Sequence, residues 1–243
     1  MSFYREIVYK KYIPLFIFAV AMGLLEAIVV VYVRELYYPE GFSFPLKPMP
    51  AWLITAELVR ELCTLLMLGA VAWIGGKVFI QRLAVFLFLF GVWDILYYIG
   101  LKVFLNWPES VFTWDILFLI PITWIGPVLA PVICSIVMIL MAIFFDWAYY
   151  HKKINKIKIP EFLLLLAGAF VILFTFTYDF GKLIIKGGFL NRLLTLPEDP
   201  DFISLLTKFV PIHYMWGLFS VGIIIILASL TIIIRRSFNS EIH

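Results

Sequence analysis

Six long apolar runs, separated by shorter polar segments, dominate the hydrophobic pattern of the chain. They lie near residues 13–33, 51–75, 79–100, 126–149, 161–181 and 211–234. About 20 apolar residues in a helix are enough to cross the ~30 Å hydrocarbon core of a bilayer. The pattern therefore predicts an all-α polytopic membrane protein with six transmembrane helices, in a single integral membrane domain over residues 1–243. The first run continues past a weak signal-peptide match, so we expect it to be an uncleaved span.

The distribution of Lys and Arg predicts the orientation of these helices. With both termini in the cytoplasm (N-in/C-in), eleven basic residues lie inside and seven outside. The inner set comprises Arg5, Lys10, Lys11, Lys77, Arg82, Lys152, Lys153, Lys156, Lys158, Arg235 and Arg236. An excess of basic residues on the cytoplasmic side is typical of plasma (inner) membrane proteins, and we expect that location.

The connection between the third and fourth runs is long and still apolar. We expect a re-entrant or interfacial element around 105–125, because Pro121, Gly126, Pro127 and Pro131 would break or kink a helix there. The alternative is a seventh span. That alternative would move the basic 152–158 segment outside, against the charge rule.

Composition supports the membrane assignment and excludes several classes of protein. Apolar residues make up 64% of the chain and charged residues only 14%, at a net charge of +3. Because no Lys/Arg run is long enough to hold nucleic acid, we expect a lipid bilayer and no nucleic acid as partner. Cys63 and Cys134 lie in apolar runs and predict neither a disulfide scaffold nor a Cys-based zinc site. Walker, dinucleotide-binding, His-Glu-x-x-His and Gly-x-Ser-x-Gly motifs are absent from the sequence.

Ionisable residues within or beside the predicted spans gather toward the outer side. A charge near the bilayer centre costs about 2.5–3.5 kcal/mol on insertion scales, so such residues normally face a partner or a cavity. We therefore treat the outer set as candidate ligand-binding residues. It comprises Glu26, Glu57, Arg60, Glu61, Asp94, Tyr98, Asp115, Asp179 and His213.

The second run carries the most specific arrangement. Glu57, Arg60, Glu61 and Thr64 stand at i, i+3, i+4 and i+7, which places them on one stripe of a helix. Arg60 can pair with Glu57, and Glu61 then needs a proton or another cation. That cation could be Arg34, Lys102, a metal ion or a cationic ligand. The alternative is an ion-pair network that only fixes helix packing.

The first and third runs add two further carboxyl groups. Glu26 follows the small residues Ala19 and Gly23, which favour close helix contact, and it needs a partner on another helix. Asp94 follows Trp93 and precedes Tyr97 and Tyr98, which predicts an aromatic wall of indole and phenol groups around a cation. Most of the tryptophans are instead typical of interface anchors, namely Trp52, Trp107, Trp124, Trp147 and Trp216.

Histidine usage limits the cofactors that we expect. His213 lies near the outer face, whereas His151 is in a predicted inner loop and His243 ends the chain. This distribution predicts no b-type haem within the bundle. No cofactor is predicted, although a divalent cation is compatible with the acidic outer set. A zinc site would need His213 together with carboxylates such as Asp179 or Asp115, and no spacing in the sequence indicates one.

Acidic residues outnumber basic ones in the outer set, which predicts an outward-facing acidic pocket for a small cationic solute or metal ion, bound or transported. In architecture alone the chain resembles the substrate-binding subunits of energy-coupling factor transporters, which are also small six-helix proteins beneath long outer loops; that resemblance implies only a fold class. Two alternatives stay open. One is a structural or assembly subunit that pairs with a partner chain of a larger membrane complex. The other is an outer-leaflet membrane enzyme that uses dispersed carboxylates and Arg60.

Overall fold

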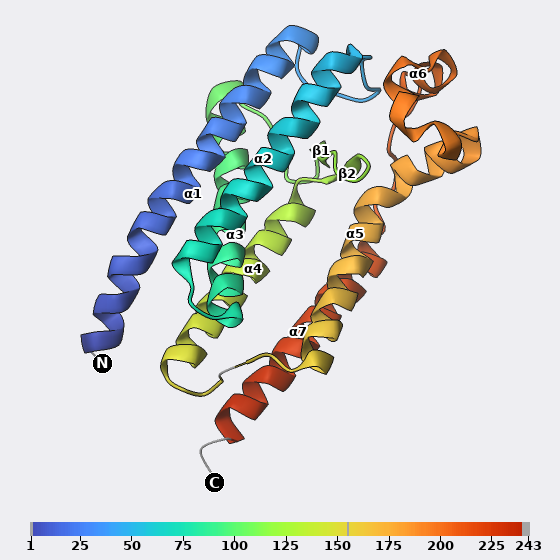
Figure 1. Cartoon of the computed structure of the whole chain (residues 1–243). Coiled ribbons are helices and arrows are strands. Elements are labelled where there is room, and N and C mark those ends of the chain that lie inside the picture. The colour runs from blue at the N-terminus through green and yellow to red at the C-terminus, as the bar shows by residue number, and fades with distance from the viewer. Residues whose placement is uncertain (1, 155, 240–243) are drawn as a thin grey trace.

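The computed structural model describes residues 2–154 and 156–239, and six of its helices are long and apolar enough to cross a membrane. These are α1 (Ser2–Tyr37), α2 (Ala51–Gly75), α3 (Phe79–Leu105), α4 (Leu129–Tyr150), α5 (Ile159–Gly187) and α7 (Trp216–Asn239), shown in Figure 1. The predicted six-helix membrane protein is confirmed, and every predicted run overlaps one of these helices, although α4 and α7 begin at Leu129 and Trp216, later than the predicted starts at 126 and 211. The side chain of Arg5 and residue His243 lie outside the described part of the chain.

The helices form two groups. In the first, α3 is central and packs against α1, α2 and α4; in the second, α5 packs along α7. Contact between the groups is sparse, and Figure 1 shows the α5–α7 pair set beside the other four helices. Glycine allows the close approach within the pair, because a Cβ atom at Gly168 would lie 2.8 Å from the Gly222 carbonyl oxygen.

The small-residue face predicted on α1 packs against α3. Ala19 and Ala27 are fully buried, and a Cβ atom at Gly23 would lie 2.6 Å from the Trp93 carbonyl oxygen. This close contact confirms the helix-packing interpretation of those small residues. The α1–α3 contact also holds Glu26 of α1 within the first helix group.

The connection between α3 and α4 forms a β-hairpin rather than a further helix. Strand β1 (Trp114–Phe118) pairs with the antiparallel strand β2 (Trp124–Pro127), with Asp115 opposite Gly126 and an irregularity between Ile116 and Phe118. The alternative of a seventh span is therefore wrong. Prolines at the turn and at the end of β2 cannot continue a helix, whereas aromatic and β-branched residues favour strands.

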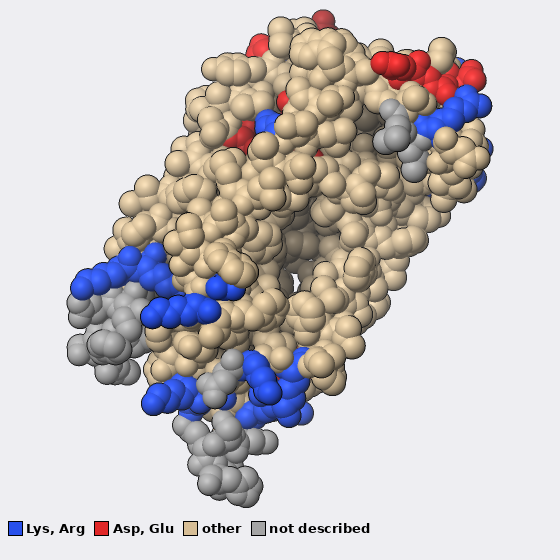
Figure 2. Space-filling view, viewed as in Figure 1, with Lys and Arg blue, Asp and Glu red and all other residues tan. Residues whose placement is uncertain are grey.

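The two ends of the bundle differ in charge. The start of α1 and the end of α7 lie at the same end of the bundle, which we call the terminal end. The hairpin, η1 (Leu190–Glu198) and α6 (Pro200–Leu206) lie toward the opposite end, which we call the hairpin end. Figure 2 shows Lys and Arg gathered at the terminal end of this face. With an even number of spans, this distribution is the one expected if the terminal end is cytoplasmic.

Two of the predicted interface anchors are instead part of the interior. Trp107 is buried, and the guanidinium group of Arg34 lies 3.8 Å from its ring centroid. Trp124 stacks on Phe176 of α5 at an interplanar angle of 12°. The anchor prediction is wrong for both residues because the loop that carries them folds back into the bundle.

Candidate functional site

Many of the predicted ionisable residues line one cavity, which we call the charged pocket. It has a volume of about 120 Å³ and lies between α1, α2, α3 and the hairpin. Its charged lining residues are five acids and two bases: Glu26, Glu57, Glu61, Asp94 and Asp115, with Arg34 and Arg60. Carboxyl groups therefore exceed guanidinium groups by three.

Arg60 is held by carboxylates from two helices. Its Nε donates to Glu57 Oε2 at 2.9 Å, one turn back on α2, and its Nη1 is paired with Glu26 of α1. The Thr64 hydroxyl donates to the Arg60 carbonyl oxygen at 3.1 Å and lies 3.4 Å from Glu26. The predicted Glu57–Arg60 pair is thus present, and the partner that Glu26 was expected to need on another helix is also Arg60, which joins α1 to α2.

Arg34 forms a second, more deeply buried ion pair. Its Nη2 donates to Asp115 Oδ1 at 2.7 Å, and the Asp115 side chain is fully buried. Burial raises the pKa of Asp115, while the charge of Arg34 opposes that rise. The guanidinium group also lies over the rings of Trp107 and Phe42, at 3.8 and 4.5 Å from their centroids. Its Nη1 has no hydrogen-bond partner among the described residues.

Glu61 and Asp94 differ from the other three acids in their partners. Glu61 Oε2 accepts a hydrogen bond from the backbone N–H of Leu119 at 2.9 Å, and Asp94 Oδ2 accepts one from the Ser135 hydroxyl at 2.7 Å. Both donors are neutral. Within the described residues, neither carboxyl group forms an ion pair, although both line the charged pocket.

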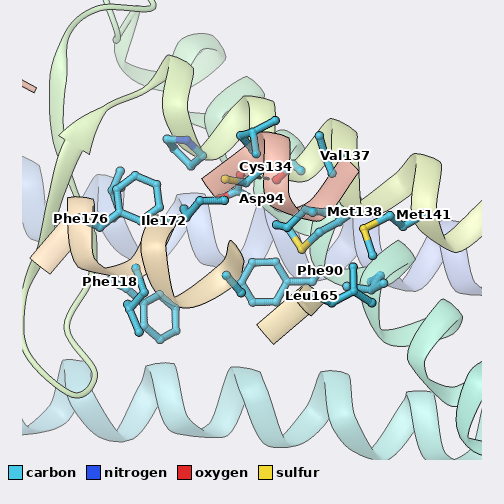
Figure 3. Close-up of a pocket in the computed structure, with 18 of the residues that line it drawn as sticks. Phe90, Asp94, Phe118, Cys134, Val137, Met138, Met141, Leu165, Ile172 and Phe176 are labelled. Atoms are coloured by element: carbon cyan, nitrogen blue, oxygen red, sulfur yellow. Dashed lines mark hydrogen bonds between the residues drawn. The ribbon is translucent and has the colours of Figure 1, made fainter. Parts of the chain in front are cut away.

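A larger cavity adjoins the charged pocket, and we call it the apolar cavity. It has a volume of about 340 Å³ and lies between α3, α4, α5, α7 and the hairpin. Asp94 is its only charged lining residue within the described chain. Figure 3 shows the labelled residues spread along its length, from Phe118 and Phe176 near the hairpin, past Asp94 and Cys134, to Met141.

The structure brings together six of the nine predicted site residues. Glu26, Glu57, Arg60, Glu61, Asp94 and Asp115 all line the charged pocket. They come from α1, α2, α3 and β1, so the hairpin is needed to complete the group.

The other three predicted residues do not line either cavity. Tyr98 is buried between α1 and α3, with its side chain toward Asp115, so it contacts a pocket residue without lining the pocket itself. Asp179 lies on α5 near Lys182, in the other helix group. His213 is exposed in the connection that precedes α7. Helical spacing could not reveal these positions because they depend on how the helices and their connections pack against one another.

Several lining residues were missed or underestimated from the sequence. Ser135 of α4 gave no signal, since a lone serine in an apolar helix is common. Of the predicted aromatic wall, Trp93 and Tyr97 do line the charged pocket beside Asp94, whereas Tyr98 does not. The apolar cavity leaves no pattern in the sequence, because its lining residues have the same composition as lipid-facing positions.

The arrangement can bind a positively charged group. Two carboxyl groups that form no ion-pair contact within the described residues, Glu61 and Asp94, share the pocket with the aromatic side chains of Trp93, Tyr97 and Phe118. The charge of Arg60 also acts on Glu61, but without a direct contact. Carboxylates attract a cation, and aromatic faces bind organic ammonium groups through their negative potential. Within the described residues, no three His, Cys, Asp or Glu side chains are grouped so that they could hold a metal ion. Comparison of the chain with protein-family models, curated proteins and solved structures finds no significant match.

Proposed function

We propose that this multi-pass membrane protein binds or transports a small cationic solute in the charged pocket. Glu61 and Asp94 would provide the negative charge, and Trp93, Tyr97 and Phe118 the aromatic surface. Arg34 and Arg60 would keep the remaining carboxylates in place. The outer face of the membrane, as the charge distribution predicts it, is the side nearest to this pocket.

A single observation carries the proposal: among the described residues, the two basic residues of the pocket form ion pairs, and two of its acidic residues do not. Arg60 is engaged by Glu57 and Glu26, and Arg34 by Asp115. A carboxylate in a low-dielectric interior needs a cation or a proton to offset its desolvation. A ligand cation beside Glu61 and Asp94 would supply that charge.

An organic ammonium group fits this pocket better than a metal ion does. Divalent metals require several oxygen or nitrogen ligands at short distances around one point. In contrast, an ammonium group needs one or two carboxylates and tolerates aromatic faces as the rest of its shell. The mixed lining of carboxyl groups and rings supports the second arrangement.

Thermal unfolding of the purified protein tests this proposal. The panel contains methylammonium, tetramethylammonium, putrescine, Mg²⁺ and Zn²⁺, measured with the wild type and with Glu61→Gln and Asp94→Asn. A ligand at 100 times its Kd should stabilise the fold by about 2.7 kcal/mol, which is readily seen as a rise in Tm. We expect an ammonium compound to raise the Tm of the wild type and to have little effect on either variant.

Two matched controls separate the pocket from general charge effects. Glu35→Gln removes an exposed carboxylate from the same helix as Glu26, and Asp179→Asn removes one outside both cavities. Both should respond to ammonium compounds as the wild type does. If no cation stabilises the wild type, or if all four variants lose the response equally, the charged pocket is not a cation site.

A further inference from the structure

The charged pocket and the apolar cavity meet at one place in the bundle. Four residues line both: Trp93 and Asp94 of α3, and Leu117 and Phe118 of β1. The Asp94 carboxyl group therefore borders a space with further acids on one side and a hydrocarbon-like space on the other. A ligand bound to Asp94 can extend into either one.

The apolar cavity has the form expected for a chain-like apolar group. Single stripes of α3 and α4 line it, such as Leu83, Leu87 and Phe90 on α3 and Cys134, Met138 and Met141 on α4. Figure 3 shows that the labelled lining side chains are spread along the direction of these helices, from Phe118 to Met141. Methionine side chains are flexible and adapt to the shape of an apolar ligand. A hydrated solute would lose its water there without finding polar partners.

The position of the cavity gives access from the bilayer. It lies where the α5–α7 pair stands beside the other four helices, and those two groups make few contacts. Figure 2 shows a hollow in the side of the molecule, about midway between the terminal end and the hairpin end. A molecule dissolved in the membrane can therefore reach the cavity without crossing the polar loops.

An unpartnered donor lies at the place where the two spaces meet. Trp93 is only 5% exposed, and its Nε1 has no hydrogen-bond partner among the described residues. The Nε1 atom of Trp124, which also lines the apolar cavity, is likewise buried and unpartnered within the described residues. Buried indole N–H groups are usually satisfied, so these two donors indicate a missing acceptor.

We propose that the ligand is an amphiphile with an ammonium head group and one unbranched apolar tail. The ammonium group lies in the charged pocket near Glu61 and Asp94, and the tail lies in the apolar cavity. An oxygen acceptor close to the head, such as a hydroxyl or carbonyl oxygen, accepts from Trp93 Nε1. This inference rests on the proposed cation site and adds the chemical class of its ligand.

The charges of the pocket favour a cationic head over an anionic one. An anionic head would need a free guanidinium group, but Arg60 is held by two carboxylates and Arg34 by one. It would also approach Glu61 and Asp94, which like-charge repulsion opposes. Among the described residues that line the charged pocket, Arg34 Nη1 is the one cationic donor without a partner, and the experiment therefore includes an anionic amphiphile.

Photolabelling in nanodiscs of phosphatidylcholine tests this assignment with the intact chain. The probe is dodecylamine that carries a diazirine near the end of its tail, and the labelled residues are identified by mass spectrometry. We expect labels on α4 and α5 at residues such as Met138 and Leu166. Excess dodecylamine should prevent this labelling, while dodecanol and dodecyl phosphate should not.

Variants separate the contributions of head and tail. Asp94→Asn should reduce cavity labelling by about tenfold, because the ammonium group then meets a neutral amide oxygen in place of a charged carboxylate. Ala169→Trp fills the apolar cavity from α5 and should abolish the labelling. Ala167→Trp is the matched control, since Ala167 is also exposed on α5 but does not line the cavity. A dodecyl amino alcohol should compete better than dodecylamine in the wild type and equally in Trp93→Phe.

Two outcomes distinguish the failure of this inference from failure of the cation site. In the first, methylammonium stabilises the wild type and Ala169→Trp alike, but the labels are spread over the lipid-facing surface and do not depend on Asp94. The ligand is then a small cation, and the proposed amphiphilic ligand is wrong. If dodecyl phosphate prevents labelling and dodecylamine does not, both the cationic head and the proposed cation site are wrong.

Discussion

Glu61 of α2 accepts a hydrogen bond from the backbone N–H of Leu119, which lies 58 residues later in the chain, between β1 and β2. The Glu61 side chain is nearly completely buried, and the oxygen-to-nitrogen distance is 2.9 Å. One carboxyl group thus lines the charged pocket and also holds the hairpin against the bundle. Leu117 and Phe118, the two residues that precede Leu119, line both cavities.

Replacing Glu61 with leucine should loosen the hairpin, whereas glutamine should not. Glutamine keeps a carbonyl oxygen that can accept from Leu119, but leucine leaves that buried N–H without a partner, at a cost of about 1–3 kcal/mol. Hydrogen exchange measured by mass spectrometry should show faster exchange over residues 114–127 in Glu61→Leu only. Equal protection in both variants would show that the hairpin is held by packing alone.

The buried pair of Arg34 and Asp115 predicts a strongly non-additive double-mutant cycle. Asp115→Ala leaves the Arg34 charge buried without its counter-ion, which typically costs about 3–5 kcal/mol. Replacing both residues, as in Arg34→Met with Asp115→Leu, should cost much less than the sum of the two single changes. Thermal unfolding of the four proteins measures this coupling, and additive changes would contradict it.

The sequence predicts the six helices because each apolar run must satisfy its backbone hydrogen bonds within the membrane, and only a helix does so locally. It also predicts the Glu57–Arg60 pair, since a spacing of three residues places both side chains on one helix face. Glu26 required a partner on another helix, and its pairing with Arg60 meets that expectation.

The remaining features depend on long-range packing, which no local pattern encodes. The hairpin occupies a segment predicted only as re-entrant or interfacial, because apolar residues interrupted by proline fit several structures. Its position brings Asp115 to Arg34 of α1, a contact across 81 residues of sequence. The separation of α5 and α7 from the other helices creates the apolar cavity. It also explains why Asp179, on α5, lies away from the pocket.

The orientation of the bundle is open to direct labelling. With both native cysteines replaced by serine, single cysteines in place of Glu109 and Lys156 report on opposite ends of the bundle, and both positions are exposed. If the basic terminal end is cytoplasmic, a membrane-impermeant maleimide added to intact cells should label Glu109→Cys and not Lys156→Cys. The reverse pattern would place the charged pocket toward the cytoplasm.

Acid should loosen the segment from η1 to α6. Burial alone would raise the pKa of Asp199, but hydrogen bonds from the N–H groups of Phe202 and Asp201, together with Arg192, bring it below the usual value. A carboxyl group whose pKa is lower in the folded state stabilises that state at pH values above its pKa in the unfolded chain, which is near 3.9 for Asp. This stabilisation is lost as the pH falls through the pKa of the folded state.

Hydrogen exchange over residues 190–206, corrected for the intrinsic effect of pH, should therefore increase below about pH 4, the range in which an unfolded Asp takes up its proton. Asp199→Asn can still cap α6 but does not titrate, so its exchange should vary less with pH. If both proteins lose protection at the same pH, another group controls this segment.

Two glycines in the same type of helix should respond oppositely to alanine. A Cβ atom at Gly91 of α3 would lie 2.7 Å from the Ser135 carbonyl oxygen and 2.8 Å from Ile139 Cγ1. A Cβ atom at Gly69 of α2 would have no described neighbour within 4 Å. Gly69→Ala should stabilise the protein by about 0.5–1 kcal/mol, because alanine loses less backbone entropy in a helix. Gly91→Ala should destabilise it by about 1–3 kcal/mol, as overpacking in a tight interface does.

The Gly91 substitution should also affect the site, because it pushes α4 away from α3 at the residue whose hydroxyl binds Asp94. We therefore expect Gly91→Ala to weaken both ammonium-induced stabilisation and cavity photolabelling, while Gly69→Ala leaves both unchanged. A Gly91→Ala protein with lower Tm but unaltered ligand response would show that the Ser135–Asp94 hydrogen bond does not position the carboxyl group for binding. Ser135→Ala would then give the same result without the change in helix spacing, since it removes the hydroxyl and keeps the backbone contact.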